Sequence, residues 1–438
     1  MKRIVIIGGG AAGLAAAVSA GEYIRSNALD VEVALFEQDE RVGRSILATG
    51  NGRCNISNSR AGVDAASAFY NGEFVARVLA HLQGRIEGAG DAGAGAFDRF
   101  GAPDQADPVF RFFSDRGLAF REESGGRLYP AANKATSVLD VLRAAARRAG
   151  VVECCGRCVK AVEPPRTPSG RFTLRMADGA FERADAVVVA VGGRALESLS
   201  VEGVRVLSPR PVLGPLRTDP AWTRELDNIR LRCKASLVRT DRSGKRRVIA
   251  PSVAGEVLFR KYGLSGIVVY DLSRFARAGD AVELNMLGCD ASEARFELRR
   301  RRERLSHVFG GDGITCDDMM RGLVLPQIGR VVLKRCGLSG ESACSDAVLD
   351  ALSAMLSAFS FEVQGMGDAD LCQVRRGGID VASVSDRDLQ ALGVPGMFFA
   401  GEALDVDGPC GGYNLHWAWG SGLVAGRAVA RFSIGGRS

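Results

Sequence analysis

A strand that runs into a glycine-rich turn and then a helix, at the start of the chain, most constrains how this protein can fold. Residues 2–7 are mostly β-branched, the turn reads Gly8-Gly9-Gly10-Ala11-Ala12-Gly13, and residues 14–20 have an alanine-rich helical pattern. In such a turn Gly8 permits the tight bend, Gly10 lets the backbone approach a pyrophosphate, and Gly13 lets the helix pack closely on the strand. The N–H groups of the first helical turn then face the phosphates. The spacing therefore predicts a dinucleotide-binding unit.

An acidic residue follows the second predicted strand at the position that such a unit requires. Residues 31–36 form an apolar, strand-like run that ends at Glu37. An acid at this place accepts hydrogen bonds from the ribose hydroxyls of the nucleotide. A glycine-rich turn in an α/β protein that binds nothing is the alternative. The complete order of strand, glycines, helix, strand and acid favours nucleotide binding.

Composition limits the classes of protein to which the chain can belong. Its 438 residues are too many for one small core and predict two or three domains. A formal charge of +6 on this length is too mild to favour nucleic acid as a partner. Eleven cysteines, an odd number without a regular framework, are expected of reduced thiols in a cytoplasmic protein. No apolar run is long enough to cross a membrane, and the short one after Lys2 and Arg3 breaks at the glycines too early for a signal peptide.

A loop rich in small and amide residues lies between 49 and 58. Asn51, Gly52, Arg53, Cys54 and Asn55 follow one another without a helical or strand period. The backbone of such a segment must find hydrogen bonds within itself or from a ligand. A plain surface loop is the alternative, but this cluster of residue types favours contact with a ligand.

The middle of the first half predicts a helix and then a β-meander. Residues 134–148 have a helical apolar period that stops at Gly150. Strand-like pieces follow at 151–162, 171–176 and 180–183, and then residues 186–191 read as a buried parallel strand that ends at Gly192. A meander inserted before a further parallel strand is common in large FAD-binding domains. Without a second pair, the Cys-x-x-Cys spacing of Cys155 and Cys158 is more simply incidental than a zinc site, and we predict no metal.

Residues 195–371 have a different character and predict an inserted domain. Short antiparallel strands are expected at 201–206, 233–241, 247–250 and 281–287, and helices at 291–308, 328–336 and 345–358. We divide the insert into a β-barrel-like part, about 195–290 and 359–371, and a helical part, about 291–358. A basic run at 299–302 predicts a solvated helix face with a Glu297–Arg301 pair, and nucleic-acid contact is the alternative.

The C-terminal segment again shows the pattern of the first domain, a buried strand followed by glycines and a helix. The first domain is therefore predicted to span 1–194 and 372–438. Residues 396–402 predict a buried strand that ends at Gly401 and Glu402, and a second glycine run precedes a small-residue helix at 417–432. Glycines directly ahead of a helix direct free N–H groups at an electron-rich group.

At this point four motifs resemble one bacterial protein family, the BaiN-type, aminoacetone-oxidase-like NAD(P)/FAD-dependent oxidoreductases, which includes a bile-acid 3-dehydro-Δ4,6-reductase. The motifs are Gly8 to Gly13, Thr49 to Asn55, Gly401 to Gly408 with Gly411 to Leu415, and Gly255 to Phe259 with Gly263 to Gly266. The resemblance runs from end to end. It implies an α/β fold: a Rossmann-type FAD-binding domain of the glutathione-reductase kind, interrupted by a β-barrel-like and helical insert.

The resemblance also implies the cofactor site. It places the pyrophosphate at the first glycine turn, the adenosine ribose at Glu37, and the flavin near Arg44 and the second and third motifs. The helix that begins near Tyr413 would direct its positive end at the N1–C2=O region, which stabilises an anionic reduced flavin. The cofactor-binding residues that we predict are Gly8, Gly10, Ala12, Gly13, Glu37, Gln38, Arg44, Asn51, Gly52, Arg53, Cys54, Asn55, Gly192, Gly401, Glu402, Gly412, Tyr413, Asn414 and Leu415.

The chain departs from the family pattern in two places. The family continues Gly-Gly-x-Ser-Tyr-Pro after the parallel strand, whereas here Gly192-Gly193 runs into Arg194 to Ser198 without that loop. The surface for substrate or nicotinamide is therefore expected to differ, which leaves any inherited activity open. His416 stands where the family usually has glutamine.

The function predicted from these features is that of an FAD-dependent oxidoreductase. NAD(P)H would dock transiently, since no second glycine fingerprint is present, and hydride would pass through flavin N5 to a small organic acceptor such as a conjugated enone. Tyr413, Cys410 and His416 are candidate proton donors, and packing explains each equally well. Disulfide reductase chemistry is not expected, because the helix after Gly13 lacks paired cysteines. The alternatives are a tRNA-modifying FAD protein and a non-catalytic flavin-binding protein.

Overall fold

The computed structural model describes residues 1–87, 107–167, 170–309, 311 and 313–435. The chain divides into two compact units. The first consists of Met1–Arg210 and Val374–Ser438, and the second of Pro211–Gln373. The predicted boundary at 194/195 falls inside the first unit, directly after Arg194.

A five-stranded parallel sheet forms the centre of the first unit, with strand order β20-β10-β1-β2-β6. Ile7 at the end of β1 pairs in register with both Phe36 and Val189, and Val189 in turn pairs with Phe399. Four strands therefore end at the same level, and the segments that follow them meet at one edge of the sheet. The strands are β1 (Lys2–Ile7), β2 (Val31–Phe36), β6 (Val152–Cys154), β10 (Ala186–Val189) and β20 (Met397–Phe399).

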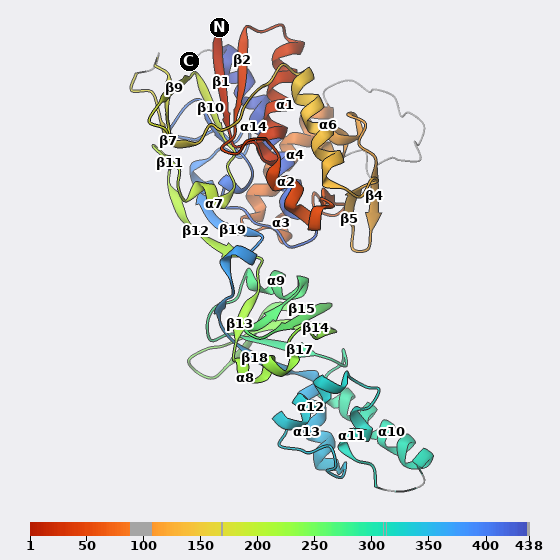
Figure 1. Cartoon of the computed structure of the whole chain (residues 1–438). Coiled ribbons are helices and arrows are strands. Elements are labelled where there is room, and N and C mark those ends of the chain that lie inside the picture. Colours follow the sequence, from red (N-terminus) through yellow and green to blue (C-terminus); the bar gives the residue numbers. More distant parts are fainter. Residues whose placement is uncertain (88–106, 168–169, 310, 312, 436–438) are drawn as a thin grey trace. The chain divides into compact units, whose positions relative to one another are not determined.

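Helices cover one face of this sheet, and a second sheet covers the other (Figure 1). The helical layer contains α1 (Ala11–Ser26), α6 (Ala135–Arg148) and α14 (Tyr413–Gly435). The opposite layer is a four-stranded sheet of order β11-β7-β8-β9. Its strands are β7 (Val159–Glu163), β8 (Phe172–Met176), β9 (Phe181–Ala184) and β11 (Ser200–Val201).

Two of the predicted strands are wrong, and glycine turns are the reason. The run 151–162 divides into β6 and β7, which belong to different sheets, because Gly156 has a φ of +69° and turns the chain. The Gly156 and Arg157 N–H groups then donate to the carbonyls of Asp39 and Glu37. The run 201–206 divides in the same way at Gly203, with a φ of +84°, into β11 and β12 (Val206–Val212).

A small sheet of order β3-β5-β4 completes the layers of the first unit. Strand β3 (Ser57–Asn58) lies against α14, while β4 (Phe120–Glu123) and β5 (Arg127–Pro130) form a hairpin. The remaining elements of this unit are α2 (Arg44–Ala48), η1 (Thr49–Gly52), α3 (Ala65–Ala68), α4 (Gly72–Glu87), α5 (Pro108–Ser114), α7 (Gly193–Leu196), β19 (Val374–Ile379), η4 (Val381–Ser383) and η5 (Gly401–Ala403).

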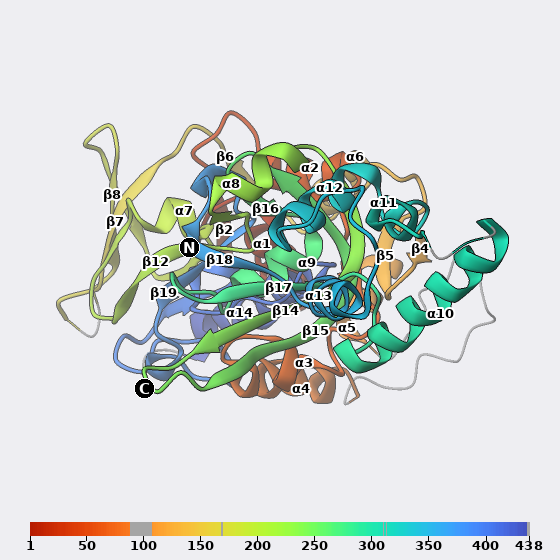
Figure 2. The same ribbon diagram turned by 90° about the horizontal axis from the view of Figure 1, so that it is seen from below.

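The second unit contains a closed six-stranded barrel with the order β13-β16-β15-β14-β17-β18. Figures 1 and 2 show β14, β15 and β17 side by side. The barrel strands are β13 (Leu216–Thr218), β14 (Arg230–Thr240), β15 (Arg246–Arg260), β16 (Gly263–Ser265), β17 (Ala281–Asn285) and β18 (Phe359–Met366). The helices of this unit are α8 (Pro220–Thr223), η2 (Arg224–Leu226), α9 (Ile267–Ser273), α10 (Ala291–Phe309), α11 (Cys316–Met320), α12 (Pro326–Arg335), α13 (Asp346–Ser357) and η3 (Ala369–Leu371).

Each unit has its own hydrophobic core. In the second unit, alternate residues of β14 such as Ala235 and Leu237 point inward, and Leu298 of α10 joins the same core. The predicted α/β fold, a Rossmann-type domain interrupted by a barrel-like and helical insert, is thus confirmed.

The basic run on α10 is used within the second unit. Arg299 and Arg302 pair with Asp346, and Arg301 donates to the carbonyls of Met319 and Arg321. The expected Glu297–Arg301 pair is wrong: Glu297 lies 3.4 Å from Arg300 instead, because Arg301 faces α11.

None of the helices in the described ranges is long and apolar enough to span a membrane. Within those same ranges, no group of three or more His, Cys, Asp or Glu side chains could hold a metal ion. All eleven cysteines lie in described segments, and no disulfide joins any two of them.

Candidate flavin site

The glycine turn after β1 is built from close backbone approaches. Gly8 has a φ of +104°, and a Cβ added there would lie 2.7 Å from the Ala190 carbonyl oxygen. A Cβ on Gly13 would lie 1.7 Å from the Gly8 carbonyl oxygen, so only glycine allows α1 to sit this close to β1. No side chain of the described chain caps α1 at Gly10, and its first turn carries no acid. The first N–H groups of α1 are therefore left for a ligand.

The carboxylate of Glu37 lies directly beside this turn. Its Oε2 atom accepts from the Gly9 N–H at 2.7 Å, and its Oε1 atom accepts from the Asp39 N–H at 2.9 Å. A carboxylate has about four lone-pair positions, so two remain for ribose hydroxyls. Gln38 faces the turn between β6 and β7, where its Oε1 atom lies 3.9 Å from the Cys158 sulfur.

Helix α2 borders the same turn on its outer side. A Cβ on Gly10 would lie 3.2 Å from the Ser45 hydroxyl, the second residue of α2. Arg44 at the start of α2 forms a 3.1 Å ion pair with Asp39 and is largely exposed. Arg44 thus lies at the start of the helix that borders the first glycine turn, with its charge balanced by a neighbouring acid, and its contact with the flavin stays a prediction.

Helices α1 and α14 are in direct backbone contact. A Cβ on Gly422 would lie 2.4 Å from the Ala12 carbonyl oxygen, and one on Gly426 would lie 2.2 Å from that of Ala16. The residue numbers of the contacting pairs increase along both helices, from Ala12 and Gly422 to Ala16 and Gly426, so the helices run in the same direction where they touch. Because α14 begins nine residues before Gly422 and α1 begins one residue before Ala12, α14 extends about two turns, or ~12 Å, beyond the start of α1. The spacing suits a ligand with its diphosphate at α1 and its ring system at α14.

Gly401 joins these two helices at the edge of the sheet. A Cβ on Gly401 would lie 2.7 Å from the Ala12 Cβ, and its N–H donates to the Ser421 hydroxyl at 2.8 Å. Its carbonyl accepts from Trp417 Nε1 at 3.1 Å. The third predicted motif is thus brought against the first.

Glu402 and Gly192 are adjacent at the same strand ends. Glu402 Oε1 accepts from the Arg375 N–H at 2.7 Å, and Glu402 Oε2 lies 3.6 Å from a Cβ placed on Gly192. Burial raises the pKa of the Glu402 carboxyl, and hydrogen bonds from the Arg375 and Gly193 N–H groups oppose that rise. Glu402 links the ends of β10 and β20 to β19.

A buried ion pair fixes the position of the segment between Glu402 and α14. Arg376 of β19 contacts Asp407 through both carboxylate oxygens, at 2.6 and 2.9 Å, and the Arg376 guanidinium stacks 4.1 Å from the Tyr70 ring centre. Asp405 accepts from the Gly377 N–H at 2.7 Å. These contacts fix the path of the chain into the glycines that precede α14.

Strand β3 determines where α14 begins. Gly412 has a φ of +103°, and a Cβ there would lie 2.2 Å from the Ser57 carbonyl oxygen. Trp419 Nε1 donates to the Ile56 carbonyl at 2.9 Å. Asn414 is turned back to the preceding loop, where its amide bonds the Gly408 N–H and carbonyl. The N–H groups at the start of α14 are positioned by segments more than three hundred residues apart in sequence.

The loop of the second motif contains unusual backbone and an unpaired acceptor. Asn51 and Cys54 both have a positive φ, +55° and +56°. Burial raises the pKa of the Cys54 thiol to about 11, and a hydrogen bond from Thr49 opposes this. The Asn55 Oδ1 atom is buried and has no hydrogen-bond partner within the described residues. Such an orphaned acceptor fits a ligand donor such as the flavin N3–H.

Arg53 of the same motif is turned toward the β4–β5 hairpin. It pairs with Glu123, donates to Asn133 Oδ1 at 2.5 Å, and stacks 4.0 Å from the Tyr129 ring centre. The hydrogen bond from Arg53 lowers the pKa of the Glu123 carboxyl. The structure thus gives the guanidinium a role in joining the loop to the hairpin, and our assignment of Arg53 to the cofactor stays a prediction.

The three candidate proton donors lie in different environments. Tyr413 directs its hydroxyl at Asp64, 3.4 Å away, and Cys410 is partly buried in the turn before it. His416 is 1% exposed, lies 2.8 Å from the Ser57 hydroxyl through Nδ1, and is 3.8 Å from Asp107 through Nε2. Burial lowers the pKa of His416, and the charge of Asp107 opposes that shift. The imidazole packs in the interior, and Ser57 beside it is fully buried.

Several residues that shape this site were missed by sequence reasoning. Arg127 and Arg376 lie in strands that no recognised motif marks. The loop at 49–58 was expected to contact a ligand, but without a specific role for Ser57 and Asn58, which form a two-residue strand. Only a pairing register could have linked them to the glycine turns, and that register involves residues far apart in the chain.

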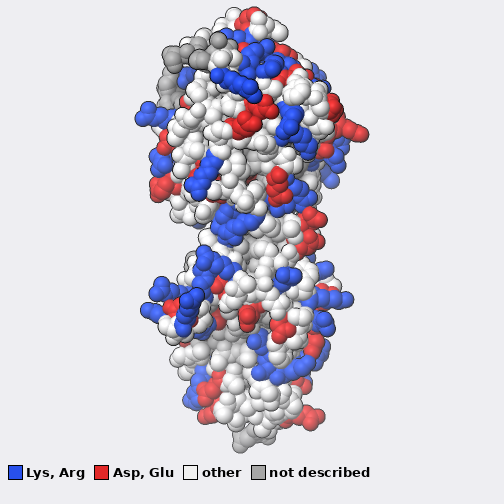
Figure 3. Space-filling view, turned by 90° about the vertical axis from the view of Figure 1, so that its left-hand side faces the viewer, with Lys and Arg blue, Asp and Glu red and all other residues white. Residues whose placement is uncertain are grey.

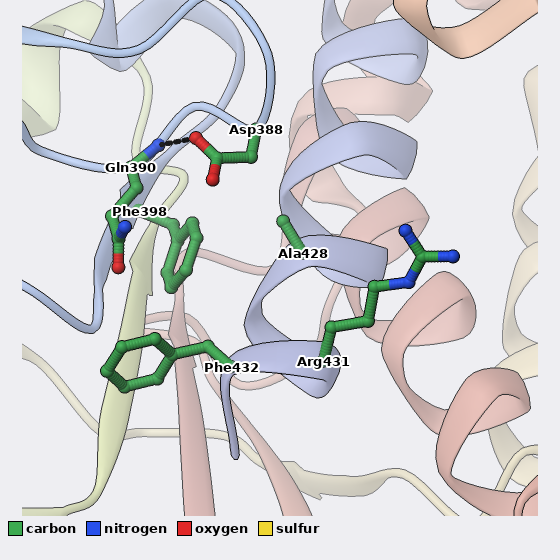
Figure 4. Close-up of a pocket in the computed structure, with 6 residues that line it drawn as sticks. All are labelled: Asp388, Gln390, Phe398, Ala428, Arg431 and Phe432. Atoms are coloured by element: carbon green, nitrogen blue, oxygen red, sulfur yellow. Dashed lines mark hydrogen bonds between the residues drawn. The ribbon is translucent and has the colours of Figure 1, made fainter. Parts of the chain in front are cut away.

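A separate hollow of about 320 Å³ lies near the other end of α14 (Figure 4). Phe398 and Phe432 line it in an edge-to-face arrangement, with their ring centres 6.0 Å apart, and the guanidinium of Arg431 is directed away from these two rings. Ser433, nearby on α14, accepts from Lys2 at the start of β1. This hollow is therefore at the opposite edge of the sheet from the glycine turns.

A Rossmann-type domain in which the first and last helices converge on the carboxyl ends of a parallel sheet defines a class of flavin-dependent oxidoreductases. The chain is an enzyme of this class. More particularly, it belongs to the family described as HI0933-like protein Rossmann domain, whose profile matches residues 2–428. The resemblance inferred from the four motifs is confirmed.

Named relatives match over nearly the full chain. The chain is 32% identical to the 3-dehydro-bile acid delta(4,6)-reductase of Clostridium scindens, over 98% of this chain and 99% of the relative. It is 26% identical to the ribosomal RNA dihydrouridine synthase of Escherichia coli K12, over 95% of each chain. Among solved structures, 3-ketosteroid-delta4-(5alpha)-dehydrogenase from Rhodococcus jostii RHA1 aligns with a TM-score of 0.44 at 15% identity, covering 98% of this chain and 97% of that chain.

Proposed function

We propose that this protein binds FAD and uses NAD(P)H to reduce a carbon–carbon double bond conjugated to a carbonyl in a small organic acceptor. FAD, when bound, supplies hydride transfer between the donor and the acceptor. The observation that carries the proposal is that α1 and α14 lie side by side and run in the same direction, with α14 extending about two turns beyond the start of α1. That geometry suits one extended dinucleotide.

The chain's own residues would bind and orient the cofactor. The N–H groups after Gly10 would hold the diphosphate, and Glu37 would accept from the ribose. Asn55 would accept from the flavin ring through its orphaned Oδ1 atom. The start of α14, fixed by Gly412 against Ser57, would present partial positive charge where negative charge develops on reduction.

The names of the relatives support the kind of acceptor. One relative is named as a Δ4,6-reductase of a 3-dehydro bile acid, in which the double bonds are conjugated to the 3-keto group. The other is named as a dihydrouridine synthase, and the uracil 5,6 double bond is conjugated to a ring carbonyl. A double bond of this kind accepts hydride at the carbon distant from the carbonyl, because the resulting negative charge is delocalised onto the carbonyl oxygen, and a proton is then added at the nearer carbon. This shared chemistry favours a conjugated enone or enone-like acceptor.

Three residues are candidates for the donor of the proton that the acceptor takes up, and their surroundings differ. Tyr413 begins α14 and Cys410 lies in the turn before it, whereas His416 is enclosed by Ser57 and Asp107. We therefore favour Tyr413 or Cys410 over His416 as the donor. Eleven cysteines that form no disulfide support the cytoplasm as the compartment.

The test is anaerobic reduction of the purified, FAD-reconstituted protein. Flavin absorbance is followed after addition of NADH or NADPH, and we expect bleaching with one of them. Failure of both to reduce the flavin refutes the nicotinamide part of the proposal. Failure to bind FAD at all refutes the cofactor site.

A second candidate is an RNA-modifying flavoprotein, which the two dihydrouridine synthases at 26% and 24% identity support. On the face drawn in Figure 3, Lys and Arg side chains are interspersed with Asp and Glu rather than gathered in one field. Ribosomal RNA binding that weakens steeply with salt would favour this candidate. Bound FAD with no turnover on any reductant would indicate a non-catalytic flavin-binding protein instead.

A further inference from the structure

Most cations around the candidate flavin site have an acidic partner. Arg44 pairs with Asp39, Arg60 with Asp64, Arg53 and Arg121 with Glu123, and Arg376 with Asp407. Arg127 differs from them. Among the described residues no carboxylate lies within ion-pair distance of its guanidinium, although Glu123 is its cross-strand neighbour in β4.

The side chain of Arg127 lies between two glycine turns. Its Cγ and Cδ atoms are 3.7 and 3.9 Å from a Cβ placed on Gly411, and its Nη2 atom is 3.7 Å from a Cβ placed on Gly125. Both glycines have a positive φ, +106° and +77°, and a side chain on either would contact this arginine. The Arg127 Nε–H donates to the Ser124 carbonyl at 3.0 Å, which orients the guanidinium and leaves its four Nη hydrogens for other acceptors.

Asn58 connects the two glycine turns through buried hydrogen bonds. This side chain is 3% exposed, and its amide donates to the Gly125 carbonyl at 2.9 Å and to the Gly411 carbonyl at 3.0 Å. Asn58 is also the register partner of Arg127 in the β3–β5 pair. Gly411 directly precedes Gly412 and the start of α14, so the arginine and the positive end of that helix flank the same turn.

We propose that Arg127 is an anion-binding residue, which takes a carboxylate or phosphate oxygen of a molecule that enters the site at the start of α14. The inference rests on the proposed function, because it assigns this anion to one of the two reactants. The planar guanidinium fork suits both oxyanion types. An unpaired cation next to a helix start would hold such a group more strongly than a surface arginine already neutralised by an acid.

Two sources can supply this chemistry, an acid group on the organic acceptor or the diphosphate of the nicotinamide donor. Two probes separate them on the FAD-loaded protein, sodium benzoate for the acceptor and inorganic pyrophosphate for the donor. Calorimetric titration of the wild type is compared with Arg127→Gln and Arg127→Lys. Arg175→Gln serves as the control, since Arg175 is an exposed residue of β8 in the four-stranded sheet.

We expect one probe to bind the wild type and to bind Arg127→Gln at least tenfold more weakly, with Arg175→Gln unchanged. Arg127→Lys should recover part of the loss, because it keeps the charge without the fork. The sensitive probe identifies the source. Equal binding of both probes to the wild type and Arg127→Gln, or no binding to the wild type, overturns the inference.

This outcome is distinguishable from failure of the proposed function. Anion binding requires no flavin reduction, so a protein that NAD(P)H reduces but that binds neither probe keeps its function and loses this role for Arg127. A protein that binds a probe through Arg127 but is reduced by neither nicotinamide loses only the nicotinamide part.

Discussion

Replacement of Gly426 by alanine tests the contact between α1 and α14. The added Cβ would lie 2.2 Å from the Ala16 carbonyl oxygen and 2.8 Å from the Ala16 Cα, whereas ordinary contacts begin at 3.4 Å. The clash is with helix backbone, which cannot rotate away as a side chain can. The helices must therefore separate by about 1 Å at this point, which is overpacking of a filled core.

The expected cost follows from two opposing effects. Overpacking typically destabilises by about 1–3 kcal/mol, and a contact this short belongs at or above the upper end. Alanine returns up to about 1 kcal/mol through helix propensity. We expect a net loss of roughly 2 kcal/mol in the free energy of unfolding, which lowers the midpoint by about 4–8 °C for a domain of this size.

The assay is thermal unfolding followed by circular dichroism, together with the affinity for added FAD. Gly435→Ala is the matched control, because it lies in the same helix and an added Cβ there meets no atom of the described structure within 4 Å. We expect Gly426→Ala to unfold earlier and to bind FAD more weakly, since the offset of the two helix starts changes. If Gly426→Ala unfolds at or above the midpoint of Gly435→Ala, the packing argument is refuted.

Three further predictions concern buried polar groups. Burial lowers the pKa of His416 below its ordinary 6.5, so the unfolded chain takes up this proton more readily and the free energy of unfolding should fall as the pH drops below 6.5. The measurement is the difference between the urea midpoints at pH 7.5 and pH 5.5. This difference should be smaller in His416→Gln than in the wild type, and unchanged in the control His307→Gln. Arg376→Met removes the guanidinium that contacts both carboxylate oxygens of the buried Asp407, so we expect a loss of about 3–5 kcal/mol in the free energy of unfolding, measured with urea. A second change, Asp407→Leu, should restore most of this loss. Asn55→Ala removes an orphaned buried acceptor and should leave the FAD-free protein as stable as the wild type or more so, while FAD binding weakens by about tenfold; equal FAD affinity would count against Asn55 as a flavin contact.

The sequence by itself determined the features that depend on short spacings. The turn from Gly8 to Gly13 combines its bend, its backbone approach and its helix start within six residues, and Glu37 follows at the end of the next strand. Each role depends on residues close in the chain, so the pattern is visible without coordinates. The family resemblance and the interrupted Rossmann-type fold were predicted on this ground.

The tertiary structure alone decided which side chains complete the site. Gly412 is required because Ser57 lies behind it, and Asn58 joins the turns at Gly125 and Gly411. The motifs predicted Gly412 and the loop that contains Ser57 and Asn58, but not that these segments touch, because each contact joins segments that meet only when the strands pair in register.

The same reason explains side-chain contacts that the motifs did not predict. Arg53 belongs to a motif with a predicted flavin contact, yet its guanidinium lies on Tyr129 and pairs with Glu123. His416 was a candidate proton donor and is enclosed by Ser57 and Asp107. A motif identifies the residue type and the loop, but the direction of a side chain depends on neighbours that the rest of the chain supplies.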